Sequence, residues 1–411
     1  MKKIFSILLA VLTAFAAQAQ TFGEYISEVE RSNAAYLAEK YNVEIADAQA
    51  VAAKVFNDPE LTADFSDNQD RTLMMGRSVE LGLSYNVNLA NARKARIDVA
   101  HEEAKVTRAL LEDYFRSLRC EAIEAWSQAW EAKSLLSLKR TSSESMDRIA
   151  ASDSLRAALG EIGRTDAMQS SIEARAMKGD LLQAEADYAN ALTALSVMAG
   201  GMTFTDITED ELGLSLSERP VDELVAIAQG RRADLRAAYL SKSLSQKNLA
   251  LVKALRSPEV GFNVGYSYNT EVRNEIPPAP LFHGVTVGVS IPLKFSSANK
   301  GERVAAEKAA QQADAAYEAA LQQIEAEVRM AWSSYKAALL AREKCSDQML
   351  ADARTILESR KAAYSQGDSS LLDYLLAVRV YNDTAEACIG AKSAVITAAA
   401  RLLAAVGCES L

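Results

Sequence analysis

Residues 366–375 read QGDSSLLDYL, and they come after 65 residues, Glu302 to Gln366, that include neither glycine nor proline. Such a stretch predicts a long helix, because glycine and proline are the residues that most destabilise a helix interior. Gly367 predicts the end of this helix, and Asp368 or Ser369 is expected to cap the next one. The sequence therefore predicts two helices joined by a tight turn.

The same arrangement occurs earlier in the chain, at an offset of 207 residues. Each copy has a glycine, an aspartate six positions later and a second glycine that closes the following helix: Gly160, Asp166 and Gly200 in the first copy, Gly367, Asp373 and Gly407 in the second. Pro59 and Pro258 pair at the smaller offset of 199, which places an insertion in the second copy. The sequence therefore predicts a tandem duplication, with a first repeat at 20–200, a linker at 201–220 and a second repeat at 221–411.

Each repeat contains two short stretches in which apolar residues alternate with small or polar ones, the pattern of a strand with two different faces. In 79–89, for example, every second residue is apolar. These stretches predict one β-hairpin per repeat, at 60–89 and 258–295, with strands of about ten residues. The insertion is explained by a proline-containing loop in the second hairpin, with Pro277, Pro278 and Pro280.

The rest of each repeat is predicted to be helical. The predicted long helices and the return helices that follow them are, in chain order, 90–159, 161–199, 300–366 and 368–406. Shorter helices, roughly Gly23 to Phe56 and Val221 to Arg256, are expected before the hairpins. A long helix would extend about 100 Å, and apolar residues at seven-residue spacing in 161–199 suit coiled-coil packing. The expected fold class is mainly α with β: tandem-duplicated coiled-coil helical hairpins with two β-hairpins per chain.

The first 19 residues have the features of a secretory signal peptide. Lys2 and Lys3 precede an apolar run from Ile4 to Ala17, and residues 17–19 form an A-x-A cleavage site. The run has 14 residues, fewer than the roughly 20 of a membrane-spanning helix, and no cysteine follows the cleavage site to carry a lipid. We expect an exported mature chain without a helical or lipid anchor.

Charge and rare residue types exclude several function classes. The net charge is −10 and no basic cluster is present, so nucleic acid is not an expected partner. The two histidines, His101 and His283, lie outside any catalytic motif. The four cysteines, Cys120, Cys345, Cys388 and Cys408, form no C-x-x-C pair and are interpreted as ordinary thiols or an unassigned disulfide. We expect no enzyme activity, no catalytic residue, no metal site and no cofactor.

Alternating strands are common in soluble, half-buried sheets, but this chain offers no large apolar helical domain to cover such a sheet. Outer-membrane barrels use strands of about ten residues with the apolar face toward lipid. Four strands cannot close a barrel, because the smallest bacterial barrels have about eight. Three copies would give a twelve-stranded outer-membrane β-barrel, continuous with a ring of long helices.

Residues 232–259 read RADLRAAYLSKSLSQKNLALVKALRSPE, 289–293 read VSIPL, and both repeats place a glycine and an aspartate before an Ala/Leu-rich helix. With the alternating strands, these features resemble the outer membrane efflux protein (TolC) family over nearly the whole mature chain. The resemblance implies a homotrimer, with a barrel in the outer membrane of a Gram-negative-type cell and an α-helical tunnel across the periplasm. It further implies a periplasmic adaptor (membrane fusion) protein and an inner-membrane pump of RND or ABC type as partners, outer-membrane lipid around the barrel, and passive conduction.

The family's gate has a Tyr just before the turn glycine, an Arg just after it, and two acids on the ascending helix. Tyr364 matches the Tyr and Asp373 the first acid, whereas Ser369 and Leu376 stand at the positions of the Arg and the second acid. The expected gate residues are Tyr364, Gly367, Asp368 and Asp373, with Gly160 and Asp166 in the first repeat. Asp373 lies about 1.5 turns into its helix, where we expect no capping role, so a ring of three Asp373 carboxylates would favour cations. Asp166 is equally consistent with an ordinary solvated carboxylate.

Two functions follow from these features. The first is an exit channel of a tripartite efflux or secretion system, whose cargo (drug, metal ion or protein) is selected by the pump. The second is a periplasmic structural or adaptor-like coiled-coil protein without a barrel.

Overall fold

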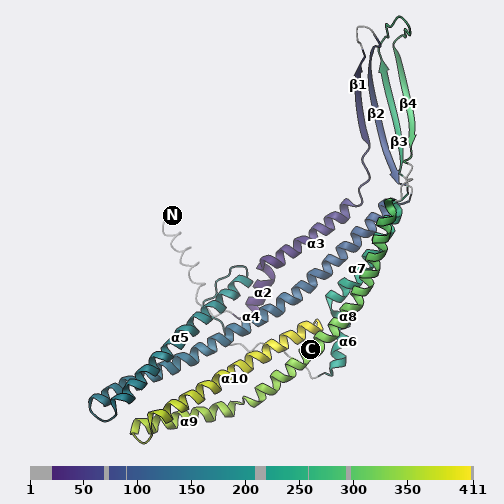
Figure 1. Ribbon diagram of the computed structural model, residues 1–411. Coiled ribbons are helices and arrows are strands. Elements are labelled where there is room, and N and C mark those ends of the chain that lie inside the picture. Colours follow the sequence, from purple (N-terminus) through teal and green to yellow (C-terminus); the bar gives the residue numbers. More distant parts are fainter. Residues whose placement is uncertain are drawn as a thin grey trace, which may run out of the picture. The chain divides into compact units, whose positions relative to one another are not determined.

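The computed structural model describes residues 21–68, 74–88, 90–208, 219–257, 259–292 and 298–408. Both halves of the chain have the same order of elements: two helices, two strands, a long helical stretch and a return helix (Figure 1). This order agrees with the predicted duplication. The predicted signal peptide and residues 209–218 of the predicted linker lie outside the described residues.

The strands form one antiparallel sheet with the order β1-β2-β3-β4 (Figure 1). Their bounds are Glu60–Asp67 for β1, Arg77–Asn88 for β2, Glu259–Asn269 for β3 and Phe282–Ser290 for β4. Strands β2 and β3 come from different repeats, so their pairing joins the two predicted hairpins. Among the described residues, β1 and β4 are each paired on one side only, which leaves two open edges.

The register places the apolar residues of all four strands on one face of the sheet. One row across the sheet consists of Leu61, Leu83, Val264 and Val287, whose exposed fractions are 73, 52, 52 and 75 %. The next row, on the opposite face, consists of Thr62, Gly82, Gly265 and Thr286. The predicted alternation is therefore confirmed for the described strands, and most of their apolar face is exposed, with Val260 buried at one end of β3. Leu89, Leu293 and Phe295, which we also assigned to strands, lie outside the described residues.

The chain divides into two compact units. One unit comprises Tyr41–Leu110 and Asp234–Ala320, and it contains the sheet with the helical segments next to it in sequence. The other comprises Met1–Lys40, Leu111–Ala233 and Leu321–Leu411, and it contains the helical turns.

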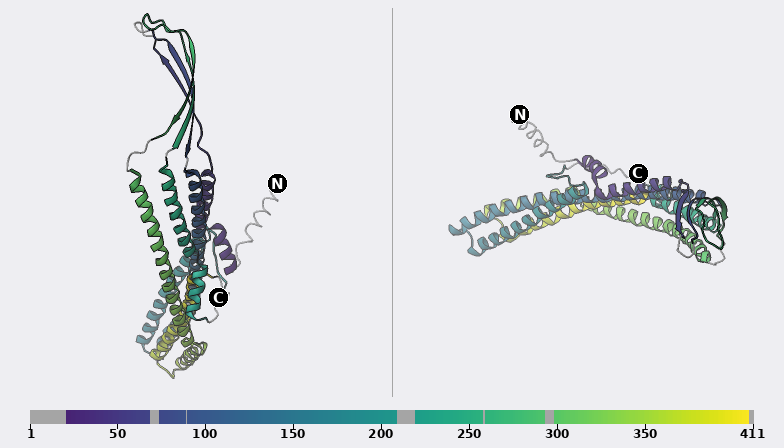
Figure 2. Two further views of the ribbon diagram at one scale, coloured as in Figure 1. Left: turned by 90° about the vertical axis from the view of Figure 1, so that its right-hand side faces the viewer. Right: turned by 90° about the horizontal axis from the view of Figure 1, so that it is seen from above.

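The helices reproduce most of the predicted ones. In the first repeat they are α2 (Phe22–Ser32), α3 (Ala34–Ala52), α4 (Ala92–Ala158) and α5 (Arg164–Met198). In the second repeat they are α6 (Val221–Arg231), α7 (Ala233–Leu255), α8 (Ala298–Lys344), α9 (Asp347–Gln366) and α10 (Leu371–Val406). Helices α4 and α5 lie side by side, as do α9 and α10 (Figures 1 and 2).

The two shorter helices predicted before the hairpins are each broken into two, so that prediction was wrong. The breaks fall at Asn33 and Arg232, where the backbone is extended. These two residues are 199 positions apart, the same offset as Pro59 and Pro258. At the first break, the Asn33 side chain donates a hydrogen bond to the Met198 carbonyl (3.0 Å) and accepts one from the Tyr36 amide (2.9 Å). Asn33 thereby satisfies backbone groups that the break leaves without helical partners.

The long helix predicted for 300–366 is also interrupted, which corrects our expectation of one continuous helix. Helix α8 ends at Lys344, and Ser346 begins α9 as an N-cap whose side chain accepts a hydrogen bond from the Met349 amide. Ser is a preferred N-cap residue, and such a cap starts a new helix without glycine or proline. The first-repeat counterpart, α4, is unbroken from Ala92 to Ala158.

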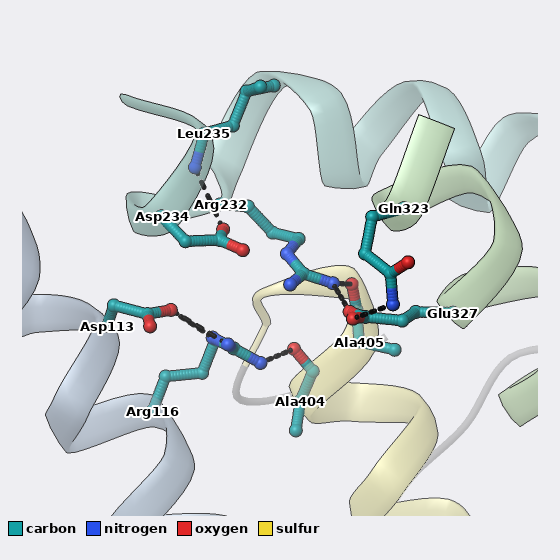
Figure 3. A network of polar contacts seen from close by, with 9 residues as sticks. All are labelled: Asp113, Arg116, Arg232, Asp234, Leu235, Gln323, Glu327, Ala404 and Ala405. Atoms are coloured by element: carbon teal, nitrogen blue, oxygen red, sulfur yellow. Dashed lines mark hydrogen bonds and ion pairs between the residues drawn. The ribbon is translucent and has the colours of Figure 1, made fainter. Parts of the chain in front are cut away.

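Helix α10 is anchored at its C-terminus by two arginines (Figure 3). Arg116 donates to the carbonyl of Ala404 (2.7 Å), and Arg232 donates to that of Ala405 (3.2 Å) and to Glu327 (2.5 Å). These carbonyls belong to the last turn of the helix, where backbone acceptors have no helical partner and a positive charge is favoured.

Helix α10 is also the one helix among the described residues that is long and apolar enough to cross a membrane. Its buried residues run along it from Leu371 to Val406. Part of its apolar surface is therefore buried inside the fold, while Leu372 and Leu376 remain exposed, and we interpret α10 as a helix that packs in the core along one face.

Candidate constriction at the helical turns

Two helical hairpins end in turns that were predicted from the repeated glycines. All four of those glycines have a positive φ, between 66° and 85°. Gly367 ends α9 in the left-handed conformation (φ 85°), and the amide of Asp368 donates to the carbonyl of Ala363 (2.9 Å). Glycine adopts this conformation without the steric cost of a β-carbon, and the hydrogen bond satisfies a terminal carbonyl. Gly160 has the same conformation after α4 (φ 80°).

Ser370, rather than Asp368 or Ser369, caps α10, so both candidates for the cap were wrong. The Ser370 hydroxyl accepts a hydrogen bond from the amide of Asp373 (3.2 Å) and donates one to the Asp373 carboxylate (2.7 Å). The Ser370 amide also approaches that carboxylate (3.4 Å), which completes a capping box. Asp373 therefore has the capping role that we had not expected, because α10 begins three residues later than predicted.

Ser369 stands at the position where the resemblance implies an Arg. Its hydroxyl also donates a hydrogen bond to the Asp373 carboxylate (3.4 Å). It thus makes a contact within its own turn. Leu376, at the position of the second acid, is exposed. Asp373 itself is exposed and ionisable, and its hydrogen bonds with the Ser370 hydroxyl and amide lower its pKa below the ordinary value.

Tyr364 and Asp153 link the two hairpins. The Tyr364 hydroxyl donates a 2.8 Å hydrogen bond to Oδ1 of Asp153 on α4. Asp153 is only 1 % exposed, and its Oδ2 has no partner within the described part of the chain. Burial, and then the hydrogen bond to Asp153, raise the pKa of Tyr364. The phenol therefore remains protonated at neutral pH, and it acts as a hydrogen-bond donor to a buried carboxylate.

An arginine and a second tyrosine complete the arrangement. Arg156 lies 3.9 Å from Asp153 and 3.5 Å from Glu161, with its guanidinium 5.6 Å from the centre of the Tyr364 ring. Tyr374 stacks on Tyr364, with the ring centres 5.7 Å apart. The aromatic pair belongs to a small apolar core whose buried members are Met146, Ile149, Ala150, Ala174, Tyr364, Leu371, Tyr374 and Val378.

The structure thus brings some of the expected gate residues together and leaves others at the surface. Tyr364 is buried, whereas Gly160, Asp166, Gly367, Asp368 and Asp373 are exposed. Asp166 is close enough to Tyr364 for its charge to contribute to the raised pKa of the phenol.

Sequence reasoning missed Asp153 and Arg156. A signal for Asp153 is present: it follows Met146, Ile149 and Ala150 at the spacing of a buried helix face, and an acid in such a position needs a partner. The identity of that partner, 211 residues away, depends on tertiary structure.

Beside these turns lies a groove of about 400 Å³ formed by α4, α5 and α10. Leu372 and Leu376 line it and are 69 and 59 % exposed, and Lys139 forms an ion pair with Glu386 at the same groove. The groove thus combines exposed leucines with charged residues.

Comparisons with known proteins agree with this fold. The chain is similar to the outer-membrane channel CmeC of Campylobacter jejuni (TM-score 0.77, 15 % identity, 94 % of this chain and 85 % of that one). It is also similar to the open state of the outer-membrane channel MtrE of Neisseria gonorrhoeae (TM-score 0.75, 19 % identity, 94 % and 89 %) and to VceC, an outer membrane protein of Vibrio cholerae (TM-score 0.70, 17 % identity, 94 % and 96 %). No curated protein matches the chain in sequence.

The family comparison gives a match to one protein family, described as "Outer membrane efflux protein", over residues 224–408. This segment runs from α6 to the end of α10, and it therefore includes half of the sheet and the α9–α10 turn. These findings confirm the resemblance that the sequence indicated. The second half of the chain, residues 224–408, therefore matches the outer membrane efflux protein family, and the fold of the chain is similar to that of outer-membrane channels.

Proposed function

We propose that the protein is the outer-membrane exit channel of a tripartite efflux or secretion system. In this proposal the mature chain forms a homotrimer that passively conducts substrates delivered by an inner-membrane pump. Three sheets close a twelve-stranded barrel in the outer membrane, and the long helices form a tunnel in the periplasm. The family match and the similarity to outer-membrane channels support this assignment.

The exposed apolar face of the sheet is the observation that carries the proposal. Leu61, Leu83, Val264 and Val287 form a continuous row across all four strands, and each is at least half exposed. In water such a face is unfavourable, whereas lipid is a suitable environment for it. The open edges of β1 and β4 carry unpaired backbone groups, which a membrane does not tolerate. Pairing β4 of one copy with β1 of the next satisfies both edges.

The Tyr364–Asp153 hydrogen bond supports a constriction at the periplasmic end of the tunnel. It connects α9 to α4, so it holds the two hairpins of one subunit together at their turns. Widening the tunnel at this end requires the hairpins to separate, and this separation breaks the bond. The exposed Asp373 carboxylates of three subunits add negative charge at the same end, which favours the passage of cations.

The groove beside the turns supports docking of a periplasmic adaptor protein. Leu372 and Leu376 offer exposed apolar surface, and Glu173 and Arg379 provide charges of both signs in the same groove. A helical hairpin with apolar residues at its tip fits these features. Adaptor binding at the turns would also place the partner next to the Tyr364–Asp153 bond.

The native mass of the mature chain, extracted in detergent from the outer-membrane fraction, tests the proposal. We expect a trimer. A soluble monomer in the periplasmic fraction would remove the barrel and leave the periplasmic coiled-coil protein as the better account. Single-channel recording of the trimer then tests the constriction, because Asp373→Ala is expected to reduce cation selectivity.

A further inference from the structure

A cavity of about 200 Å³ lies where α4 meets the end of α10 and the junction of α6 and α7. The channel assignment does not use it. Three arginines line it, Arg116 and Arg119 from α4 and Arg231 from the last turn of α6. Glu112 is the one acidic residue among the described residues of the lining. Positive charge therefore predominates at this cavity.

The rest of the lining is mainly apolar. Phe115 is half-buried, and Ile123 and Leu403 are buried. The Cys120 thiol also lines the cavity, and burial raises its pKa to about 12, so it stays neutral at physiological pH. An apolar wall with a few polar groups that converge on one place is the usual composition of a site for a small molecule.

Arg116 is held in a fixed orientation at this cavity (Figure 3). Its Nε and Nη2 atoms donate to Oδ1 of Asp113 (2.9 and 2.7 Å), and Nη1 donates to the carbonyl of Ala404 (2.7 Å). These bonds use three of the five N–H groups of the guanidinium. Because the side chain is already ordered, binding an anion to the other two N–H groups costs little conformational entropy.

Arg231 lines the same cavity without a counter-charge. Its Nη1 donates a hydrogen bond to the thiol of Cys408 (3.4 Å), which is a weak acceptor. The guanidinium is exposed, and it forms no ion pair with a residue that the structure describes. A cation in this setting favours an anionic ligand, because a carboxylate offers much stronger hydrogen bonds than a thiol does.

The duplication shows that the fold does not need these positive charges. With the offset of 207 residues, the two arginines of α4 correspond to Gln323 and Ala326 of α8. With the offset of 199, Arg231 corresponds to Ser32. The equivalent positions in the other half are therefore uncharged, and the arginines gather on one side of the duplicated fold only.

We propose that this cavity binds a small organic carboxylate. The carboxylate accepts hydrogen bonds from the arginine guanidiniums, whose planar geometry matches it, and the apolar body of the ligand lies against Phe115, Ile123 and Leu403. The volume is below the roughly 300–1,000 Å³ of pockets for drug-sized molecules, so the ligand is smaller than these. A bound anion stabilises the region in which α4, the α6–α7 junction and the end of α10 meet.

The test is isothermal titration calorimetry of the full mature chain in a nonionic detergent, with benzoate as the probe. We expect saturable binding of one benzoate per chain. Benzamide has nearly the same shape without the charge and should not bind, and inorganic phosphate has charge without an apolar body and should bind more weakly. Absence of saturable benzoate binding, equal binding of benzamide, or tighter binding of phosphate than of benzoate would overturn the proposal.

Variants of one exposed arginine locate the site. Arg231→Gln should weaken benzoate binding by about tenfold or more, because a charge-assisted hydrogen bond is lost. Arg231→Lys keeps the charge and should weaken binding less. Arg140→Gln is the matched control, because Arg140 is an exposed arginine of α4 that lies outside the lining of the cavity.

Unchanged affinity in Arg231→Gln, or an equal loss in Arg140→Gln, would place benzoate elsewhere and refute the site. Thermal melting of each variant without ligand checks that it is folded. The titration requires neither a barrel nor conduction, so its outcome is independent of the proposed channel function.

Discussion

The hydroxyl of Tyr364 on α9 and the buried carboxylate of Asp153 on α4 form a 2.8 Å hydrogen bond that joins the second repeat to the first. A carboxylate that is 1 % exposed is costly unless it is partnered, and its Oδ2 has no partner among the described residues. Arg156 is 3.9 Å away and also interacts with Glu161. Tyr364 is therefore the hydrogen-bond donor of a buried carboxylate that is only partly satisfied, and this makes the bond a suitable element for the proposed constriction.

Replacing Tyr364 by phenylalanine is expected to weaken this connection. The ring and its stacking on Tyr374 are kept, but Asp153 loses its donor, at a cost of about 1–3 kcal/mol in the free energy of unfolding. In single-channel recordings, the variant trimer should spend more time in high-conductance states than the wild type.

Tyr188→Phe is the matched control, because Tyr188 also donates to an aspartate, Asp206 (2.6 Å), but lies away from the turns. It should lower stability without changing conductance. Equal conductance of the Tyr364 variant and the wild type would contradict a role of the bond in closing the tunnel.

The capping box of α10 predicts a dependence on pH. The hydrogen bonds with Ser370 depress the pKa of Asp373 in the folded protein, so the ionised carboxylate stabilises the helix start above its ordinary pKa of about 3.9. This contribution is lost as the pH falls through the depressed folded value. Melting temperatures of the wild type and of Asp373→Asn, measured from about pH 7 down to about pH 3, should therefore differ at neutral pH and converge in acid.

In Ser370→Ala the main cause of the shift is removed, so the pKa of Asp373 should return toward its ordinary value. A constant difference in melting temperature between the wild type and Asp373→Asn across this range would show that the charge of Asp373 does not support the cap.

The buried guanidinium of Arg232 is expected to be essential for the C-terminal end of α10 (Figure 3). In Arg232→Met the carbonyl of Ala405 and the carboxylate of Glu327 lose a donor, and we expect a loss of about 3 kcal/mol. Hydrogen exchange at the end of α10 should increase in the same variant. Arg329→Met is the control: its ion pairs with Asp222 and Glu325 are exposed and screened by solvent, so it should destabilise the protein far less. Similar losses in the two variants would argue against a special role of the buried arginine.

The overall fold could be predicted because its signals are local and occur twice. The alternation in the strand segments and the absence of glycine and proline from 302–366 are local signals that do not depend on distant contacts. The offset of 207 residues identified both turns. The errors also have local causes. Ser370 and Asp373 have the spacing of a capping box. The prediction instead placed the start of α10 directly after Gly367, three residues before its actual start. Ser346 interrupts the long helix as an N-cap, without glycine or proline nearby.

The candidate site was less predictable, because its chemistry arises from pairs that are far apart in sequence. Asp153 reaches Tyr364, 211 residues away in sequence, only when the helices of the fold are placed side by side. The sequence indicates that an acid on a buried helix face needs a partner, but the partner itself is set by packing.

The two faces of the sheet offer a final prediction about the membrane. Val287 and Thr286 are neighbours on β4, and the register places Val287 on the apolar face and Thr286 on the opposite one. Val287→Arg should impair assembly, because an arginine toward lipid costs about 2–4 kcal/mol at the middle of a bilayer. In the proposed barrel, Thr286→Arg introduces the same side chain on the face toward the lumen, where water would solvate it, and it should leave the amount of trimer unchanged. The measurement is the amount of trimer that each variant forms in the outer-membrane fraction. If the two variants assemble equally well, or if only Thr286→Arg fails to assemble, lipid does not cover the apolar face. Because both substitutions add the same volume and charge at adjacent positions, a selective defect of Val287→Arg can be attributed to the side of the sheet that it occupies.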